Sequence, residues 1–126
     1  MADIIVRIPE DQLQHFWNDK GETALTAFWR FPFRPRQARE DEDYIWFVTR
    51  AGVVAGAAIY RITDEKIDSP DPSGKWNVEW IGNWMVELDP PEASVQFASR
   101  GFRYAKPEEQ ELLRRRWGAA KEARDE

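Results

Sequence analysis

The sequence predicts one α+β domain with a small, strongly bent five-stranded sheet that closes toward a barrel, N-terminal helices and a C-terminal helix. Two observations predict the sheet. Residues 75–89 alternate apolar and polar side chains, as a strand with one buried face does. Residues 44–62 form two apolar segments around a glycine-containing turn, as a β-hairpin does.

Composition restricts the chemistry. At 126 residues, with 42% hydrophobic and 33% charged residues, the chain can bury a core as a single domain. It has no cysteine and one histidine, which excludes disulfides, thiolate metal sites, cysteine nucleophiles and multi-histidine centres. We therefore expect no metal and no cofactor. Neither a signal peptide nor a membrane span is recognisable, so we expect a cytoplasmic protein with no membrane partner.

The N-terminal part predicts a strand and two helices. Residues Ile4–Ile8 are apolar and stop at a proline, so we expect a short strand. Residues 9–17 begin with proline and acids and place Leu13, Phe16 and Trp17 on one face, which favours a helix. A second short helix is expected over residues 22–28, and an irregular loop over residues 29–36 because two prolines interrupt it.

The central hairpin is the most strongly predicted element. Residues 44–49 are apolar on both faces, which indicates a strand buried on both sides, with Trp46 in the core. The chain turns at residues 50–52 and returns as a strand over residues 53–62. Gly56 lies in the middle of the returning strand, where a bulge or a close backbone approach would explain a glycine.

The tryptophan-rich strand over residues 75–89 is too long to run straight, and Gly82 is where we expect it to bend. Trp76, Trp80 and Trp84 share its apolar face, so they either belong to the core or line a pocket. Pro90 and Pro91 are expected to end the strand.

The last strand is expected within residues 94–104. Pro107 then opens a helix with leading acids, trailing arginines and an inner face of Leu112, Leu113 and Trp117. We expect Gly118 to end this helix. The domain would then cover residues 1–118, and residues 119–126 would be a frayed charged tail.

Two segments resemble a known superfamily. The hairpin over residues 44–59, Tyr-Ile-Trp-Phe-Val-Thr-Arg-Ala-Gly-Val-Val-Ala-Gly-Ala-Ala-Ile, is similar to the central hairpin of PUA-like domains of the ASCH and EVE branches. Arg100-Gly-Phe-Arg-Tyr104, followed by residues 108–117, is similar to the terminal strand and helix of EVE-type domains. The resemblance implies a nucleic-acid-binding module that holds a modified or single-stranded base in an aromatic pocket.

Such a pocket needs aromatic faces for stacking and polar groups that contact phosphates or read the base edge. The candidate walls are Trp17, Trp29, Phe31 and Trp80. The candidate phosphate or edge contacts are Arg30, Arg34, Arg36 and Arg103, and Glu79 and Asn83 could read the base edge. Each candidate has a structural alternative: the tryptophans can be core, and the arginines near residue 36 can pair with the acids at residues 40–43.

Two other functions stay open. The first is a protein–protein adaptor that uses the aromatic and arginine-rich loop, which suits the net charge of −5 better than nucleic acid does. The second is an ASCH-like amidohydrolase acting on a modified nucleoside, with Lys20, Thr23 and Glu79 as the groups that would have to converge. The lysine-containing ASCH motif itself is missing near Gly21.

Structure can separate these functions. A concave, tryptophan-lined pocket rimmed by arginine would favour a nucleic-acid base. A flat exposed aromatic patch would favour a protein partner, and a buried carboxylate–lysine pair in a pocket would favour an enzyme.

Overall fold

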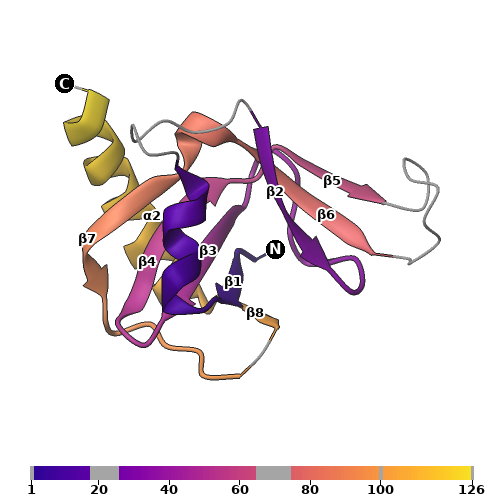
Figure 1. Ribbon diagram of the computed structural model, residues 1–126, viewed down its shortest axis with the longest axis horizontal. Helices are drawn as coiled ribbons and strands as arrows, with labels where there is room; N and C mark the ends of the chain where they lie inside the picture. The colour runs from indigo at the N-terminus through magenta and orange to yellow at the C-terminus, as the bar shows by residue number, and fades with distance from the viewer. Residues whose placement is uncertain (1, 18–25, 65–74, 100, 126) are drawn as a thin grey trace.

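The strands of the described chain form two sheets, shown in Figure 1. The computed structural model describes residues 2–17, 26–64, 75–99 and 101–125. The larger sheet has the order β7-β4-β3-β1-β8 and the smaller sheet the order β2-β6-β5. The strands are β1 (Ile4–Arg7), β2 (Thr26–Phe31), β3 (Tyr44–Thr49), β4 (Gly52–Ala58), β5 (Arg61–Asp64), β6 (Trp76–Ile81), β7 (Val86–Glu92) and β8 (Phe102–Tyr104).

Within the part of the chain that the structure describes, three helical segments accompany the sheets. Two are 3₁₀ helices, η1 (Glu10–Phe16) and η2 (Gly82–Trp84), and the third is the α-helix α2 (Pro107–Asp125). No helix in the described ranges has both the length and the apolar character needed to cross a membrane.

Strand β3 is the centre of a three-layer arrangement. On one face, Trp46 and Val48 pack with Leu113 of α2. On the other face, Ile45 and Phe47 belong to a second core cluster that includes side chains of the smaller sheet and partly buried side chains of η1. The double apolar face predicted for residues 44–49 is therefore confirmed, because each face has its own covering layer.

The α+β class and the C-terminal helix are confirmed, but the number and grouping of strands differ from the prediction. We expected five strands in one bent sheet, and the described chain has eight in two sheets that do not close into a barrel. Along the described strands the chain changes sheet four times. Two of these changes, after β4, where residues 61–64 form β5, and at Gly82, each divide a segment that the sequence pattern treats as one strand.

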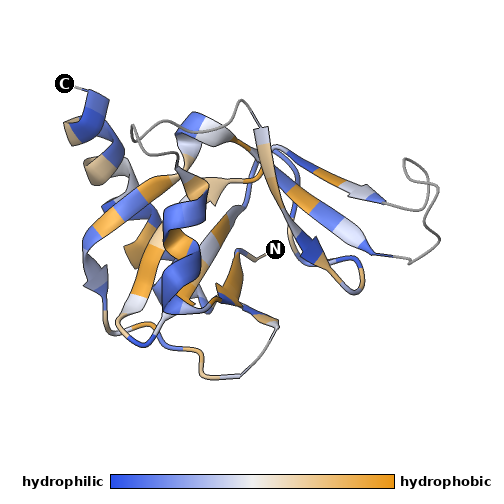
Figure 2. Ribbon diagram, viewed as in Figure 1, coloured by the Kyte–Doolittle hydropathy of each residue, from blue (hydrophilic) through white to orange (hydrophobic). Residues whose placement is uncertain are grey.

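The predicted bend at Gly82 is confirmed, because η2 separates β6 from β7 there. Apolar and polar residues alternate along both strands (Figure 2). The expectation that Pro90 ends the strand is wrong: β7 continues to Glu92, and the Asp89–Pro90 peptide bond is cis. Strand β7 is an edge of the larger sheet, where a proline without an N–H group is tolerated.

Strand β2 replaces two predicted elements. Residues 26–28 were expected in a helix and residues 29–31 in an irregular loop, but all six form a strand paired with β6. The rest of the predicted helix, residues 22–25, lies outside the described residues. The burial pattern has the two-residue period of a strand, with Phe31 buried and Phe28 and Arg30 exposed. The prolines that suggested a loop begin only after this strand.

The hairpin β3–β4 shows why Gly56 is a glycine. Gly56 is opposite Trp46 in the register. A Cβ atom at Gly56 would lie 2.0 Å from Cε3 of Trp46, so the indole occupies the space of the missing side chain. The group that approaches Gly56 is therefore a side chain and not the backbone or bulge that the sequence suggested. Trp46 is fully buried, as predicted.

Helix α2 does not end at Gly118, and residues 119–125 are helical rather than a frayed tail. A glycine inside a helix costs about 1 kcal/mol relative to alanine. Contacts beyond Gly118 offset this cost: Arg124 donates hydrogen bonds to the backbone carbonyls of Met85 and Asn83, at 3.0 and 2.6 Å. The last predicted strand is also shorter than expected, because residues 94–99 form no strand and only β8 remains.

Candidate functional site

The ten predicted site residues do not converge on one pocket. Nine of them fall into three groups: four aromatic side chains in or against the core, three arginines at separate places on the surface, and two residues on the outer face of the smaller sheet. The tenth, Asn83, lies on η2.

The aromatic candidates pack inward. Phe31 and Trp80 are 2% and 1% exposed, so a base could reach neither ring without opening the core. Trp29 is partly buried, and its ring lies 5.3 Å from that of Phe47. Trp17 packs against the same core and borders a small hollow of about 260 Å³ beside the C-terminal half of α2. The structural alternative therefore holds for Trp80, whereas Trp84, also a core candidate, is 39% exposed because η2 interrupts the alternation.

The arginine candidates are dispersed. Arg34 lies over the ring of Trp76, 5.0 Å from its centroid. Arg103 forms a two-pronged ion pair with Glu109, at 2.7 and 2.8 Å. This pair lowers the pKa of Glu109, because the guanidinium stabilises the ionised carboxylate. Arg36 is exposed.

Pairing with the acids at residues 40–43 occurs at one of the nearby arginines. Arg39 forms ion pairs with Glu42 and Asp43, at 2.6 and 3.4 Å.

Asn83 is exposed on η2, and its backbone carbonyl accepts the hydrogen bond from Arg124.

The outer face of the smaller sheet brings Arg30 and Glu79 together. In strand register Phe28 is opposite Glu79, and Arg30 is opposite Asn77. Because side chains alternate, Phe28, Arg30, Asn77 and Glu79 share the face that turns away from Trp80 and the core. Phe28 is 52% exposed, which is unusual for a phenylalanine in the middle of a strand. We call these four residues, with Arg61 and Thr63 of β5, the platform.

Three polar side chains of the platform, Arg61, Thr63 and Glu79, are joined by hydrogen bonds. Arg61 donates to both carboxylate oxygens of Glu79, at 3.1 and 3.3 Å, and the hydroxyl of Thr63 donates to one of them at 2.7 Å. These hydrogen bonds fix the orientation of the Arg61 guanidinium. Arg61 lies on β5, which pairs with β6, the strand whose Glu79 is opposite Phe28. The side-chain carbonyl oxygen of Asn77 is buried and has no hydrogen-bond partner in the described chain.

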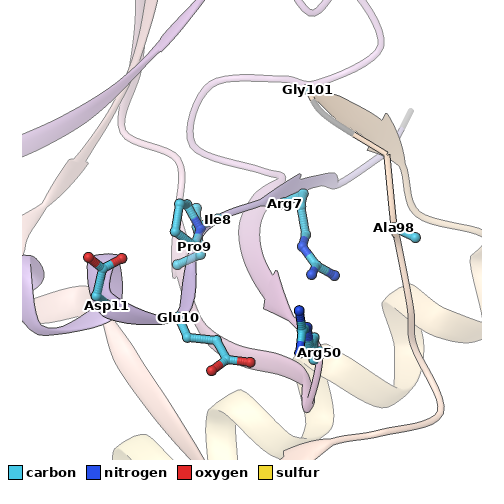
Figure 3. A pocket seen from close by; sticks show the side chains of 8 residues that line it. All are labelled: Arg7, Ile8, Pro9, Glu10, Asp11, Arg50, Ala98 and Gly101. Atoms are coloured by element: carbon cyan, nitrogen blue, oxygen red, sulfur yellow. The ribbon is translucent and has the colours of Figure 1, made fainter.

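A groove of about 790 Å³ lies elsewhere on the molecule, and none of the ten predicted residues lines it (Figure 3). Its lining combines the end of β1, the start of η1, the β3–β4 turn and the segment before β8. These segments contribute Arg7, Ile8, Pro9, Glu10, Asp11, Arg50, Ala98 and Gly101. Sequence reasoning missed it because these segments are far apart in the chain.

A buried polar cluster joins the N-terminus, residue 43 and α2. Asp3 is fully buried and accepts hydrogen bonds from the Tyr44 backbone N–H (3.0 Å) and the Trp46 indole (2.9 Å). Arg114 donates to Asp3 through Nε and Nη2 and also to Asp43, at 3.0 Å. These acceptors raise the pKa of Arg114, and the hydrogen bonds to Asp3 are the main cause. With its lone pairs so engaged, Asp3 has a structural role.

No described set of three or more histidine, aspartate or glutamate side chains is arranged to hold a metal ion. Nor does any known protein supply an assignment: no family model matches the chain, and neither a curated protein nor a solved structure matches it.

Proposed function

We propose that the chain is a PUA-like module that binds single-stranded nucleic acid, with the platform as the surface on which bases stack. The observation that carries this proposal is Phe28, half exposed in the middle of strand β2. An aromatic ring in this position can stack on a base without any base-flipping pocket, because a single strand has bases that are already accessible. The geometry therefore favours binding of single-stranded nucleic acid over binding of a flipped, modified base.

The neighbours of Phe28 supply the polar part of such a site. Arg30 lies two residues along the same strand face, within reach of a phosphate next to the stacked base. The Arg61 guanidinium, oriented by Glu79, offers a second flat surface, and guanidinium planes also stack on bases. Glu79 can accept a hydrogen bond from a base amino group through its remaining lone pairs.

Binding on this surface should be of limited strength and sensitive to salt. The net charge of −5 opposes the approach of a polyanion, and the platform holds two arginines next to one glutamate. Stacking would supply most of the affinity, at about 1–3 kcal/mol per base.

The test is a fluorescence-anisotropy titration of labelled single-stranded DNA and RNA at low salt, with duplexes for comparison. The same titrations would be repeated with single strands that carry modified cytosine or adenine. Phe28→Ala should weaken single-strand binding by at least about fivefold, because it removes one stacking surface. Phe33→Ala is the matched control, since Phe33 is a 60% exposed phenylalanine outside the strand that carries Phe28.

Equal affinities of the two variants would contradict the platform as the binding surface. A strong preference for a modified base would instead indicate an enclosed binding pocket, because an open stacking face does not enclose the modification.

The second candidate is a protein partner, and the exposure of Phe28 next to arginine side chains favours it. Exposed aromatic and arginine side chains are typical interface anchors. If no oligonucleotide binds and Phe28→Ala leaves folding intact, the platform would be assigned to a protein partner instead. For the amidohydrolase, Lys20 and Thr23 lie outside the described residues, and Glu79 is already bound by Arg61. No observation favours that candidate.

A further inference from the structure

The groove at the end of β1 holds an arginine that is anchored in place. The Nη1 of Arg7 donates to the backbone carbonyl of Phe97 at 3.3 Å, and its backbone N–H donates to the carbonyl of Gly101 at 3.3 Å. Arg7 is partly buried and paired through its strand with Val48 of β3. Its guanidinium is therefore positioned by the sheet and retains further N–H groups that Phe97 does not use.

A second arginine reaches the same groove from the β3–β4 turn. Thr49 and Gly52 are paired, so Arg50 and Ala51 form a two-residue turn, and the Ala51 N–H donates to the Thr49 hydroxyl at 3.2 Å. Gly52 has a positive φ of 109° and abuts the backbone of Glu92, which fixes the turn. Arg50 itself is exposed and makes no hydrogen bond or ion pair with any described residue.

The two guanidinium groups face the same space without a carboxylate between them. Figure 3 shows the side chain of Arg7 directed toward Arg50, whereas Asp11 points away from both. Glu10 borders the groove on the side of Arg50, yet no ion pair joins Glu10 to either arginine in the described chain. Two like charges in one groove repel each other, and an anion that both could bind would relieve this repulsion.

We propose that this groove binds a nucleotide, with its phosphate between Arg7 and Arg50 and an amino group of its base near Glu10. Phosphate is the anion that matches paired guanidinium groups, because each can donate two parallel hydrogen bonds to it. The volume of about 790 Å³ is in the range of small-molecule sites, and Ile8, Pro9 and Ala98 provide apolar walls. The site is separate from the platform and does not depend on its assignment.

The first test is calorimetric titration with adenosine 5′-monophosphate at low salt. The unmodified chain should show saturable one-to-one binding, and Arg50→Gln should weaken it by about tenfold or more, because it removes a charge-assisted contact. Arg115→Gln is the control, since Arg115 is an exposed arginine on α2 that pairs with Glu111. Absence of saturable binding of both the mononucleotide and 5′-phosphorylated strands, or equal affinity of the two variants for both ligands, would overturn the proposal.

Inosine 5′-monophosphate tests the contact to Glu10, because it replaces the amino group with a carbonyl. It should bind more weakly than the adenosine nucleotide, and Glu10→Gln should reduce this difference. If both nucleotides bind equally, the role of Glu10 is wrong.

The phosphate could come from a free nucleotide or from the end of a strand. Comparing 5′-phosphorylated with 5′-hydroxyl strands in the Arg50→Gln and Phe28→Ala variants separates these sources. An effect of Arg50→Gln confined to phosphorylated strands would indicate a strand end, and an effect confined to mononucleotides would indicate a free nucleotide. If Phe28→Ala alone loses strand binding, the result bears on the platform and leaves the proposal for the groove unchanged.

Discussion

At the scale of single residues, Trp46 and Gly56 form one packing unit. Truncating the buried Trp46 to alanine should lower the free energy of unfolding by about 3–5 kcal/mol, because it leaves a cavity and removes the donor to Asp3. Gly56→Ala should also destabilise the protein, since its methyl group would overlap the indole. In the Trp46→Ala background the same change should cost far less. A double-mutant cycle in urea measures this coupling, and additive effects would contradict it.

Asn77 is the second residue whose substitution has a predictable sign. Its buried side-chain oxygen has no partner in the described chain, and an unmet buried acceptor costs about 1–3 kcal/mol. Asn77→Val should therefore raise the free energy of unfolding by about 1 kcal/mol, helped by the strand preference of valine. Asn77→Asp should lower it, because it buries a charge. Thermal denaturation of both variants checks the prediction, and a destabilised valine variant would refute it.

At the scale of elements, the ion pair between Arg103 and Glu109 joins β8 to α2 and makes their contact dependent on pH. The pKa of Glu109 is lowered in the folded state from its ordinary value of 4.5, so the protonated form destabilises the fold. The pair's stabilisation is thus complete above about pH 4.5 and is lost as the pH falls through the folded-state pKa. Urea midpoints at neutral and acidic pH should differ less for Glu109→Gln than for the unmodified protein.

The neighbouring Glu108→Gln is the control for this prediction, because Glu108 is exposed and forms no ion pair in the described chain. If both variants lose the same acid sensitivity, the Arg103–Glu109 pair is not its source.

At the scale of the whole molecule, sequence patterns predicted what depends on neighbouring residues. The hairpin, the burial of Trp46 and the bend at Gly82 follow from alternation and from glycine placement within one segment. The second sheet was missed because prolines next to β2 suggested a loop, although its alternation was readable in the sequence. The order of the strands within the two sheets could not be predicted, since it depends on contacts between segments that are far apart in the chain.

The candidate site was harder to predict for the same reason. Arg30 and Glu79 were chosen separately, and only the pairing of β2 with β6 places them near Phe28. Phe28 was missed because residues 22–28 were predicted to form a helix; the strand register of β2 turns its side chain outward. Asp3, Asp43 and Arg114 carried no local signal, because the cluster exists only once both chain ends meet.

The position of β1 has a consequence for how the protein is made in the cell. Strand β1 lies between β3 and β8, and the carboxylate of Asp3 just before it is neutralised by Arg114. During translation β1 therefore leaves the ribosome well before its partner strand β8. The larger sheet cannot be completed until residue 104 has emerged, so the nascent chain exposes the apolar hairpin until then.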